Sequence, residues 1–307
     1  MKVRKSAATA AIAVLALTAT ACSSSESGTS DDDVLIGGSG GKDQPRLPTY
    51  PVAKSVDLDS PTLKKAQKAG KIVIGAKNDL PFLGFEDKEG TRSGFDAEVA
   101  KMVAADLGFS PAQIEFKTVE SSVRETAIAQ GDVDLYVGTY TINDRRKKQV
   151  GFAGPYFVAG ADLLVRKNDK TIAGPFSLQG KTVCSIKGST SLQEIKKPDY
   201  GTKTLELDKY SACVQQLLDK KVDAVTTDDA ILMGFAAQRP SKLKVVGRPF
   251  TKEPYGIGMD KSDKVLRDAV SDSLEAHDTN GDLMEAYDAT LGLSGSGWIG
   301  PPMLERY

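Results

Sequence analysis

The sequence predicts an α/β protein with two domains of similar size. From Lys71 onward, short runs of β-branched residues alternate with segments of helical periodicity, and this pattern starts again after Gly160. The order strand, helix, strand favours parallel sheets covered by helices on both faces. A last strand and two helices follow the second unit, which indicates that the chain returns to the first domain. Because ligand sites are common where two domains meet, we expect the functional site in the cleft between them.

The first unit is predicted from its apolar pattern. KIVIGA at 71–76 is typical of a buried strand, and it follows a short helix at 62–69. Apolar residues from Phe95 to Leu107 recur at the spacing of one helical face, and Gly108 is expected to end this helix. The remaining elements are a strand at 114–118, a helix at 122–130 and a strand at 133–137.

The second unit repeats this alternation. Its predicted strands are 162–166, 182–186, 203–207, 222–226 and 243–246, and its predicted helices are 189–196, 210–218 and 229–237. The return segment is predicted as a strand at 255–259 followed by helices at 265–277 and 282–290. We therefore place the first domain at 60–159 and 253–307, and the second domain at 160–252.

The N-terminus is typical of an exported protein. Three basic residues precede a stretch of apolar and small residues that ends at Cys22, so we expect a signal peptide at 1–21. The apolar run is too short for a membrane span of about 20 residues. Small residues followed by cysteine resemble the bacterial lipoprotein signal, which implies acylation of Cys22; an ordinary signal peptide and a chance cysteine are the alternatives. Residues 22–48, rich in Ser, Asp and Gly, are expected to form a flexible tether.

Composition argues against several classes of function. The formal net charge is −1, and without the three basic residues of the leader it becomes about −4, which argues against nucleic acid as a partner. A Ser-His-Asp triad would have to use His277, the one histidine, and we do not expect a triad there. No cluster of Cys and His predicts a zinc site. We therefore expect neither a catalytic triad nor a metal site, and no cofactor; that the protein is not an enzyme is implied by the family resemblance described below.

One of the three cysteines lies at the end of the predicted leader, and the other two lie in the second domain. With Cys22 acylated, Cys184 and Cys213 remain as an even pair in an oxidising compartment, so we expect a disulfide between them. The alternative is a pair of buried free thiols.

Eight short motifs occur in one order along the chain. They are IGAKNDLPF (74–82), GFD (94–96), GDVD (131–134), TYTINDRR (139–146), FAGPY (152–156), GKTV (180–183), GST (188–190) and VDAVTTDD (222–229). In this order they resemble the polar amino-acid-binding proteins of ABC importers, the bacterial solute-binding proteins of family 3. The resemblance covers about 71–291. It implies a type II periplasmic-binding-protein fold, in which each of two lobes is a mostly parallel sheet flanked by helices and the lobes close around one amino acid without chemical turnover.

The resemblance implies ligand contacts on the first lobe. Arg146 matches the family arginine that holds the ligand α-carboxylate, and a planar guanidinium suits a bidentate carboxylate. Thr141 would add a hydroxyl and an amide N–H, and Gly138 or Thr139 a carbonyl for the α-ammonium. The alternative is that Arg146 belongs to a solvated basic run at 145–148.

The resemblance also implies contacts on the second lobe. Thr190 matches a family position between a strand and a helix, where free N–H groups can receive a carboxylate. Asp228 matches the acid that holds the α-ammonium, whereas Asp229 is expected to be a charge at a helix N-terminus. The alternative is that both acids cap that helix. Arg146 and Asp228, from opposite lobes, would make closure depend on a zwitterionic ligand.

Three residues are expected to select the ligand side chain. Lys77 stands where binders of basic amino acids commonly carry an acid, and a cation there prefers an anionic group. Ser121 and Arg124 resemble the pair that holds the distal carboxylate in aspartate- and glutamate-binding members, although each residue alone could lie on the surface. Tyr210 is the candidate for an aromatic contact, because 79–80 lack the aromatic residue of many relatives. Glutamine and asparagine therefore stay as alternative ligands.

Together these observations predict an exported monomer, held by a lipid on Cys22 at the outer face of the cytoplasmic membrane. It would bind glutamate or aspartate and present it to an ABC permease. Closure is expected at two hinges, 158–161 and 248–253. Two other functions would use the same fold: a sensory module read by a membrane signalling partner, and a dehydratase of small acids. Transport and sensing would use the same cleft, so the sequence does not separate them.

Overall fold

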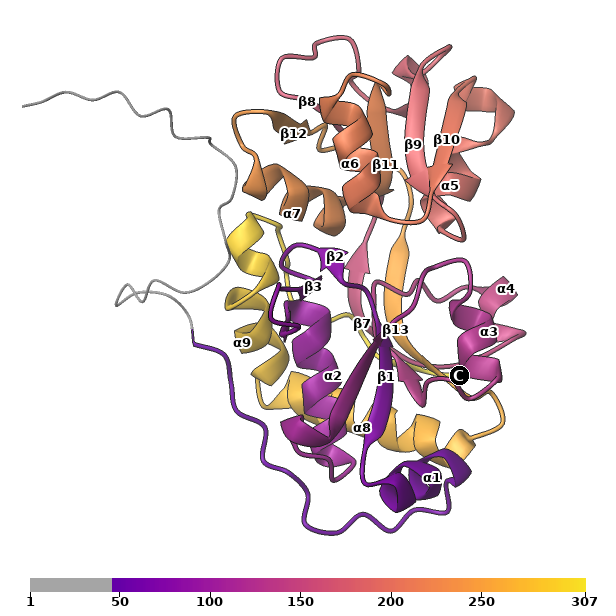
Figure 1. Ribbon diagram of the computed structural model, residues 1–307, viewed down its shortest axis with the longest axis vertical. Coiled ribbons are helices and arrows are strands. Elements are labelled where there is room, and N and C mark those ends of the chain that lie inside the picture. Colours follow the sequence, from indigo (N-terminus) through magenta and orange to yellow (C-terminus); the bar gives the residue numbers. More distant parts are fainter. Residues whose placement is uncertain (1–45) are drawn as a thin grey trace, which may run out of the picture. The chain divides into compact units, whose positions relative to one another are not determined.

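The computed structural model describes residues 46–307, so the predicted leader at 1–21, Cys22 and most of the tether lie outside the described residues. In this range no helix is both long and apolar enough to cross a membrane. The described chain forms two lobes, each with a central β-sheet flanked by helices (Figure 1). The predicted two-lobed α/β class is therefore confirmed.

Lobe 1 is built on a six-stranded sheet in the order β14-β7-β13-β6-β1-β5. Its parallel part consists of β1 (Ile72–Ala76), β5 (Ile114–Thr118) and β6 (Leu135–Tyr136). The remaining strands are β7 (Gly151–Ala159), β13 (Glu253–Met259) and β14 (Glu305–Arg306). β1 has the sequence IVIGA and is buried at four of its five positions, as expected for a central strand with helices on both faces.

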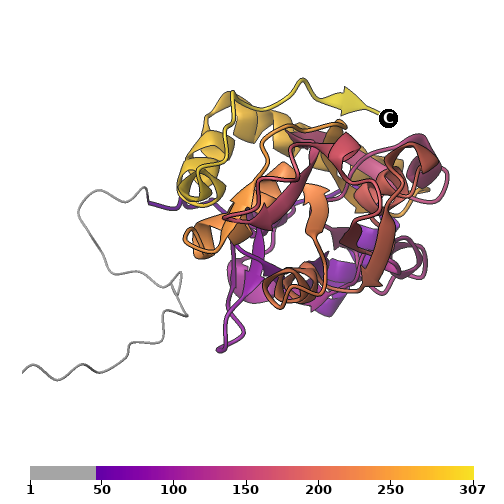
Figure 2. The ribbon, with the colours of Figure 1, turned by 90° about the horizontal axis from the view of Figure 1, so that it is seen from above.

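Helices cover this sheet. α1 (Pro61–Ala69) begins where the Ser60 hydroxyl accepts the amide N–H of Leu63, and it ends at Gly70, which is left-handed. The other helices of lobe 1 are α2 (Phe95–Asp106), α3 (Arg124–Ala129), α4 (Asp144–Lys147), α8 (Lys264–Thr279) and α9 (Asp282–Asp288). α2 is buried over most of its length and packs against α8 and α9. From above, the yellow C-terminal segment leaves these helices and ends in the short strand β14 (Figure 2).

Lobe 2 is built on a five-stranded sheet in the order β10-β9-β11-β8-β12. Its strands are β8 (Ala161–Arg166), β9 (Thr182–Ile186), β10 (Lys203–Leu207), β11 (Ala224–Asp228) and β12 (Leu243–Val245). Its α-helices are α5 (Thr190–Ile195), α6 (Tyr210–Leu218) and α7 (Asp229–Gln238). Cys184 of β9 and Cys213 of α6 form the predicted disulfide, with their Cα atoms 5.5 Å apart, so α6 is covalently attached to the sheet.

Both sheets are mixed, which corrects the prediction of mostly parallel sheets. β13 pairs antiparallel with β6 and β7, and β8 pairs antiparallel with β11 and β12. The connection between the lobes explains this: β7 leads out of lobe 1 directly into β8, and β13 returns beside β7 in the opposite direction. A small antiparallel sheet of β2 (Asp79–Leu80), β3 (Gly84–Glu86) and β4 (Arg92–Ser93) is also absent from the sequence-based prediction.

The two connections between the lobes touch at Gly160. A Cβ atom on Gly160 would lie 2.7 Å from Cβ of Pro249 and 2.7 Å from the carbonyl oxygen of Thr251. Only glycine permits so close an approach. The segments 158–161 and 248–253, predicted as hinges, therefore lie side by side, while hinge motion itself stays a prediction.

His277 lies on lobe 1, where its ring contacts two aspartates and a tyrosine. Its Nδ1 is 2.6 Å from Asp282 Oδ2, its Nε2 is 3.2 Å from Asp106 Oδ2, and the ring of Tyr50 packs edge-on at 5.7 Å. Burial lowers the pKa of His277, but the carboxylates of Asp106 and Asp282 outweigh burial and give a net increase. The imidazole therefore joins α8 to α2, α9 and the segment that precedes α1.

Candidate functional site

A narrow pocket with a cavity volume of about 10 Å³ lies between the two lobes. Eight of the ten residues predicted to bind a ligand line it: Ser121, Arg124, Thr139, Thr141, Arg146, Thr190, Tyr210 and Asp228. Ser189, Ser191 and Ile231 complete the lining. This volume has room for about one water molecule, so an amino acid would enter the pocket only with the lobes further apart.

Arg146 supplies one end of the pocket. It lies on α4, where the side chain of Asn143 accepts the amide N–H of Arg146 and fixes the start of this short helix. Its guanidinium is fully buried, donates to the carbonyl oxygen of Thr141 at 2.6 Å and lies 5.0 Å from the centre of the Tyr140 ring. Burial and the neighbouring charge of Arg124 lower the pKa of Arg146 to about 9. A negative ligand group beside it would relieve both effects.

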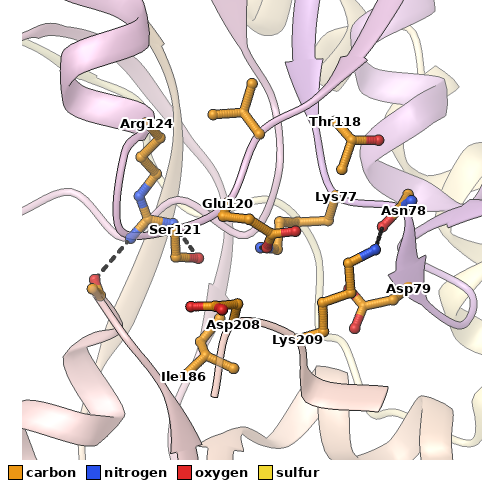
Figure 3. Close-up of polar contacts among 12 residues, drawn as sticks. Lys77, Asn78, Asp79, Thr118, Glu120, Ser121, Arg124, Ile186, Asp208 and Lys209 are labelled. Atoms are coloured by element: carbon orange, nitrogen blue, oxygen red, sulfur yellow. Dashed lines mark hydrogen bonds and ion pairs between the residues drawn. The ribbon is translucent and has the colours of Figure 1, made fainter. Parts of the chain in front are cut away.

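Arg124 approaches the same point from α3. Cζ of its guanidinium lies 4.2 Å from the centre of the Tyr140 ring, and the guanidinium donates to the Ser121 hydroxyl at 3.3 Å. Arg124 and Arg146 both donate across the cleft to the carbonyl oxygen of Gly188, at 3.3 and 3.0 Å. Figure 3 shows Arg124 reaching past Ser121 toward lobe 2.

One carboxylate accompanies the two arginines. Glu125 Oε1 lies 3.3 Å from Nε of Arg146 and 3.9 Å from Nε of Arg124. Two guanidinium groups and one carboxylate leave one net positive charge at this end. The end is therefore suited to an anionic group, since charge-assisted hydrogen bonds from arginine favour a carboxylate.

Two carboxylates lie near the opposite end: Asp228 lines the pocket, and Glu253 lies outside the lining and is bonded to the lining residue Thr190. Asp228, between β11 and α7, accepts hydrogen bonds from the Tyr255 hydroxyl at 2.7 Å and the Ser191 hydroxyl at 3.2 Å. Glu253, the first residue of β13, accepts from the Thr190 hydroxyl at 2.7 Å. Burial and the charge of Glu253 raise the pKa of Asp228 to about 7. An anion-binding end and an acidic end in one small pocket match the charges of a zwitterion.

Lys77 and Gly138 do not line this pocket. Lys77 is 2% exposed, and its Nζ lies 3.1 Å from Glu120 Oε2 (Figure 3). Gly138 packs against it, since a Cβ there would lie 3.3 Å from Cγ of Lys77. Both residues support the wall behind Ser121 and Thr139, and the positive charge of Lys77 is compensated by a carboxylate.

The lobes also touch beside the pocket. Lys209 of lobe 2 donates to the Asn78 side chain at 3.1 Å, and the amide N–H of Ser211 donates to Asp79 at 3.0 Å (Figure 3). On lobe 2, α7 comes so close to lobe 1 that a Cβ on Gly234 would lie 2.5 Å from the carbonyl oxygen of Pro81. With these contacts the structure has its lobes closed on each other.

Sequence reasoning missed several polar residues of the site. Ser189 and Ser191 flank the predicted Thr190, so the GST motif could have indicated them. Glu253 stood in the predicted hinge, and no local pattern marked it as a residue of the site. Glu125 follows Arg124 directly, but no local pattern distinguishes it from a surface acid.

Comparison with known proteins agrees with this geometry. The family described as bacterial extracellular solute-binding proteins, family 3, matches residues 72–292. A glutamate-binding protein GluB of Corynebacterium efficiens is 36% identical over 95% of this chain and 92% of that protein. A glutamine-binding protein of Geobacillus stearothermophilus is 38% identical over 83% of this chain and 92% of that protein.

A solved structure shares the fold. An ancestral arginine-binding protein bound to arginine superimposes with a TM-score of 0.67 at 36% identity, over 71% of this chain and 97% of that one. The relatives named here are binding proteins and not enzymes. The chain belongs to the bacterial extracellular solute-binding proteins of family 3.

Proposed function

We propose that this protein is the extracytoplasmic binding component of an ABC importer and that its ligand is glutamate or aspartate. The observation that carries the proposal is the charge distribution of the pocket: two arginines face one glutamate at one end, and two carboxylates lie at the other. The similarity to a glutamate-binding protein over 95% of the chain supports the same ligand class.

In this proposal the arginine end of the pocket holds both carboxylates of the ligand, and the acidic end holds its ammonium group. Arg146, Thr141 and Thr190 receive the α-carboxylate, and Asp228 receives the α-ammonium. Arg124, with Ser121, receives the distal carboxylate of the side chain. A planar guanidinium can make two parallel hydrogen bonds to each carboxylate, which suits both arginine roles.

Glutamine is the alternative ligand. Glutamine-binding relatives reach 38% identity, and the pairing of Lys77 with Glu120 reduces the positive charge beside the side-chain end. Calorimetric titration with glutamate, aspartate, glutamine, asparagine, histidine and arginine separates these ligands. We expect glutamate or aspartate to bind most tightly. Tight binding of arginine or histidine without binding of glutamate would overturn the acidic-ligand proposal.

Closure on the ligand is the proposed mechanism. A ligand that contacts both lobes stabilises the closed state through contacts that the open state lacks. The proposed hinges are the adjacent segments 158–161 and 248–253. Small-angle scattering should show a smaller radius of gyration with glutamate than without it, and an unchanged radius would contradict closure.

The location of the protein in the cell envelope is a separate proposal. A lipid on Cys22 would hold the monomer at the outer face of the cytoplasmic membrane, beside the permease that it supplies. Metabolic labelling with a fatty acid tests this: the wild-type chain should be labelled and Cys22→Ala should not. Equal labelling of both chains would exclude this anchor.

A further inference from the structure

In the part of the chain that the structure describes, no cationic side chain pairs with the acids at the acidic end of the pocket. Asp228 and Glu253 are 5% and 3% exposed. Between residues 46 and 307, no Lys, Arg or His lies within ion-pair distance of either carboxylate. Burying two negative charges without a cationic partner costs free energy. A cation or a proton must therefore compensate one of these charges.

Two neighbouring residues at the start of α5 donate hydrogen bonds to the two carboxylates. Ser191 donates to Asp228 Oδ1, and the adjacent Thr190 donates to Glu253 Oε2. The other oxygen of Glu253 accepts from the hydroxyl of Thr251 at 2.7 Å. Both acids thus lie against the start of α5, where their charges repel each other.

The groups around Asp228 do not supply the missing charge. Tyr255 on β13 is a neutral donor, and Tyr210 on α6 lies close enough for the charge of Asp228 to raise its pKa further, beyond the effect of burial. Asp229 on α7 adds a third negative charge, held by the amide N–H groups of Gly160 and Ala230. Arg124 and Arg146 line the same pocket, but their guanidinium groups donate to the carbonyl oxygen of Gly188.

We propose that Asp228 carries a proton when the lobes are closed, as in this structure, and no ligand is bound, and that the ammonium group of a bound amino acid replaces this proton. The O–H bond of the carboxyl breaks, the proton passes to the buffer, and the ligand ammonium, already charged, pairs with the resulting carboxylate and with Glu253. This inference rests on the proposed function, because it requires an amino-acid ligand in the pocket.

The proton release can be measured directly. Calorimetric titration of the wild-type protein with glutamate, in phosphate and in Tris at three pH values, gives the number of protons released from the difference in observed enthalpy. With the pKa of Asp228 at about 7, release should be about 0.9 proton at pH 6, about 0.5 at pH 7 and about 0.1 at pH 8. Affinity should rise about tenfold from pH 6 to pH 8, since the proton competes with the ligand at low pH.

The variant Glu253→Gln tests whether the charge of Glu253 keeps Asp228 protonated. Glutamine keeps polar atoms for Thr190 and Thr251 but removes the charge that opposes ionisation of Asp228. Proton release at pH 7 should fall to less than half of the wild-type value. Glu206→Gln, which removes an acid paired with Lys196 at 2.5 Å on β10, is the matched control and should behave as the wild type.

Each outcome separates the two proposals. Tight binding with the same enthalpy in both buffers at every pH overturns the proton exchange and leaves the proposed function intact. Absence of binding for all six amino acids overturns both. If Glu253→Gln does not fold, as judged by circular dichroism, the wild-type buffer series still decides the question.

Discussion

Replacing Gly188 by alanine should weaken ligand binding because it prevents the lobes from closing. Gly188 has a φ of +79°, and a Cβ atom there would lie 2.5 Å from the carbonyl oxygen of Ser121 on the opposite lobe. Cβ contacts shorter than 3.0 Å are essentially never observed, so the lobes would have to move apart by at least about 0.5 Å.

The size of the effect follows from the contacts that such a shift disturbs. The Gly188 carbonyl accepts from Arg124 at 3.3 Å and from Arg146 at 3.0 Å, and both bonds would reach or exceed the limit of hydrogen bonding. Hydrogen bonds to charged groups contribute about 1.5–3 kcal/mol each. Loss of one or both destabilises the closed state by about 1.5–6 kcal/mol, which weakens binding by about 10- to 20,000-fold.

The matched control is Gly180→Ala. Gly180 also lies on lobe 2 with a φ of +74°, but a Cβ there has no atom within 4 Å. Both variants therefore strain the backbone, and only Gly188→Ala obstructs closure. Calorimetry should give Gly180→Ala the wild-type affinity for glutamate. In small-angle scattering, addition of glutamate should reduce the radius of gyration of Gly180→Ala but not that of Gly188→Ala. Equal affinities of the two variants would refute the reasoning.

Three further predictions concern charge and covalent structure. Glu120→Gln should raise the affinity for glutamate relative to glutamine, because the positive charge of Lys77 is then no longer compensated. Titration with both ligands gives the ratio of the two affinities. An unchanged ratio would contradict a role of Lys77 in selecting the ligand. Replacing Cys184 and Cys213 by alanine should lower the free energy of unfolding in urea by about 3–4 kcal/mol, as for a cross-link spanning 29 residues, and the wild type with reductant should match the variant. His277 has a raised pKa in the folded state, so its stabilising charge is fully present below its unfolded pKa of about 6.5 and is lost as pH rises through the folded value. The stability advantage of the wild type over His277→Gln should therefore be larger at pH 6 than at pH 9, and equal advantages would contradict this.

The central strands and most helices could be predicted from the sequence because their signals are local. β1 is a continuous apolar run, and α1 carries its own capping residue and terminal glycine. β7 gave no such signal, since it contains Gly154 and Pro155, which disfavour strands. Its partner β13 lies about 100 residues later, so only the tertiary structure reveals the pairing and the mixed sheet.

The pocket divides in the same way. Arg146, Thr190 and Asp228 stand in short motifs whose order along the chain could be compared with a family. Glu253 joins the site through a hydrogen bond to Thr190, 63 residues away, and the start of β13 carries no pattern that announces this contact. Residues that bind within a motif were therefore predictable, whereas residues that act on the motif from another element were not.

Lys77 shows why one charge in a sequence is a poor guide to ligand charge. Glu120, 43 residues later, lies 3.1 Å from its ammonium and forms a neutral pair with it. Among the ionic groups described at this end, the net positive charge then comes from Arg124 and Arg146 against Glu125. The α-carboxylate, which glutamate and glutamine share, uses the charge of Arg146 with either ligand. Discrimination between the two ligands therefore depends on Arg124, which would face a carboxylate in one complex and a neutral amide in the other.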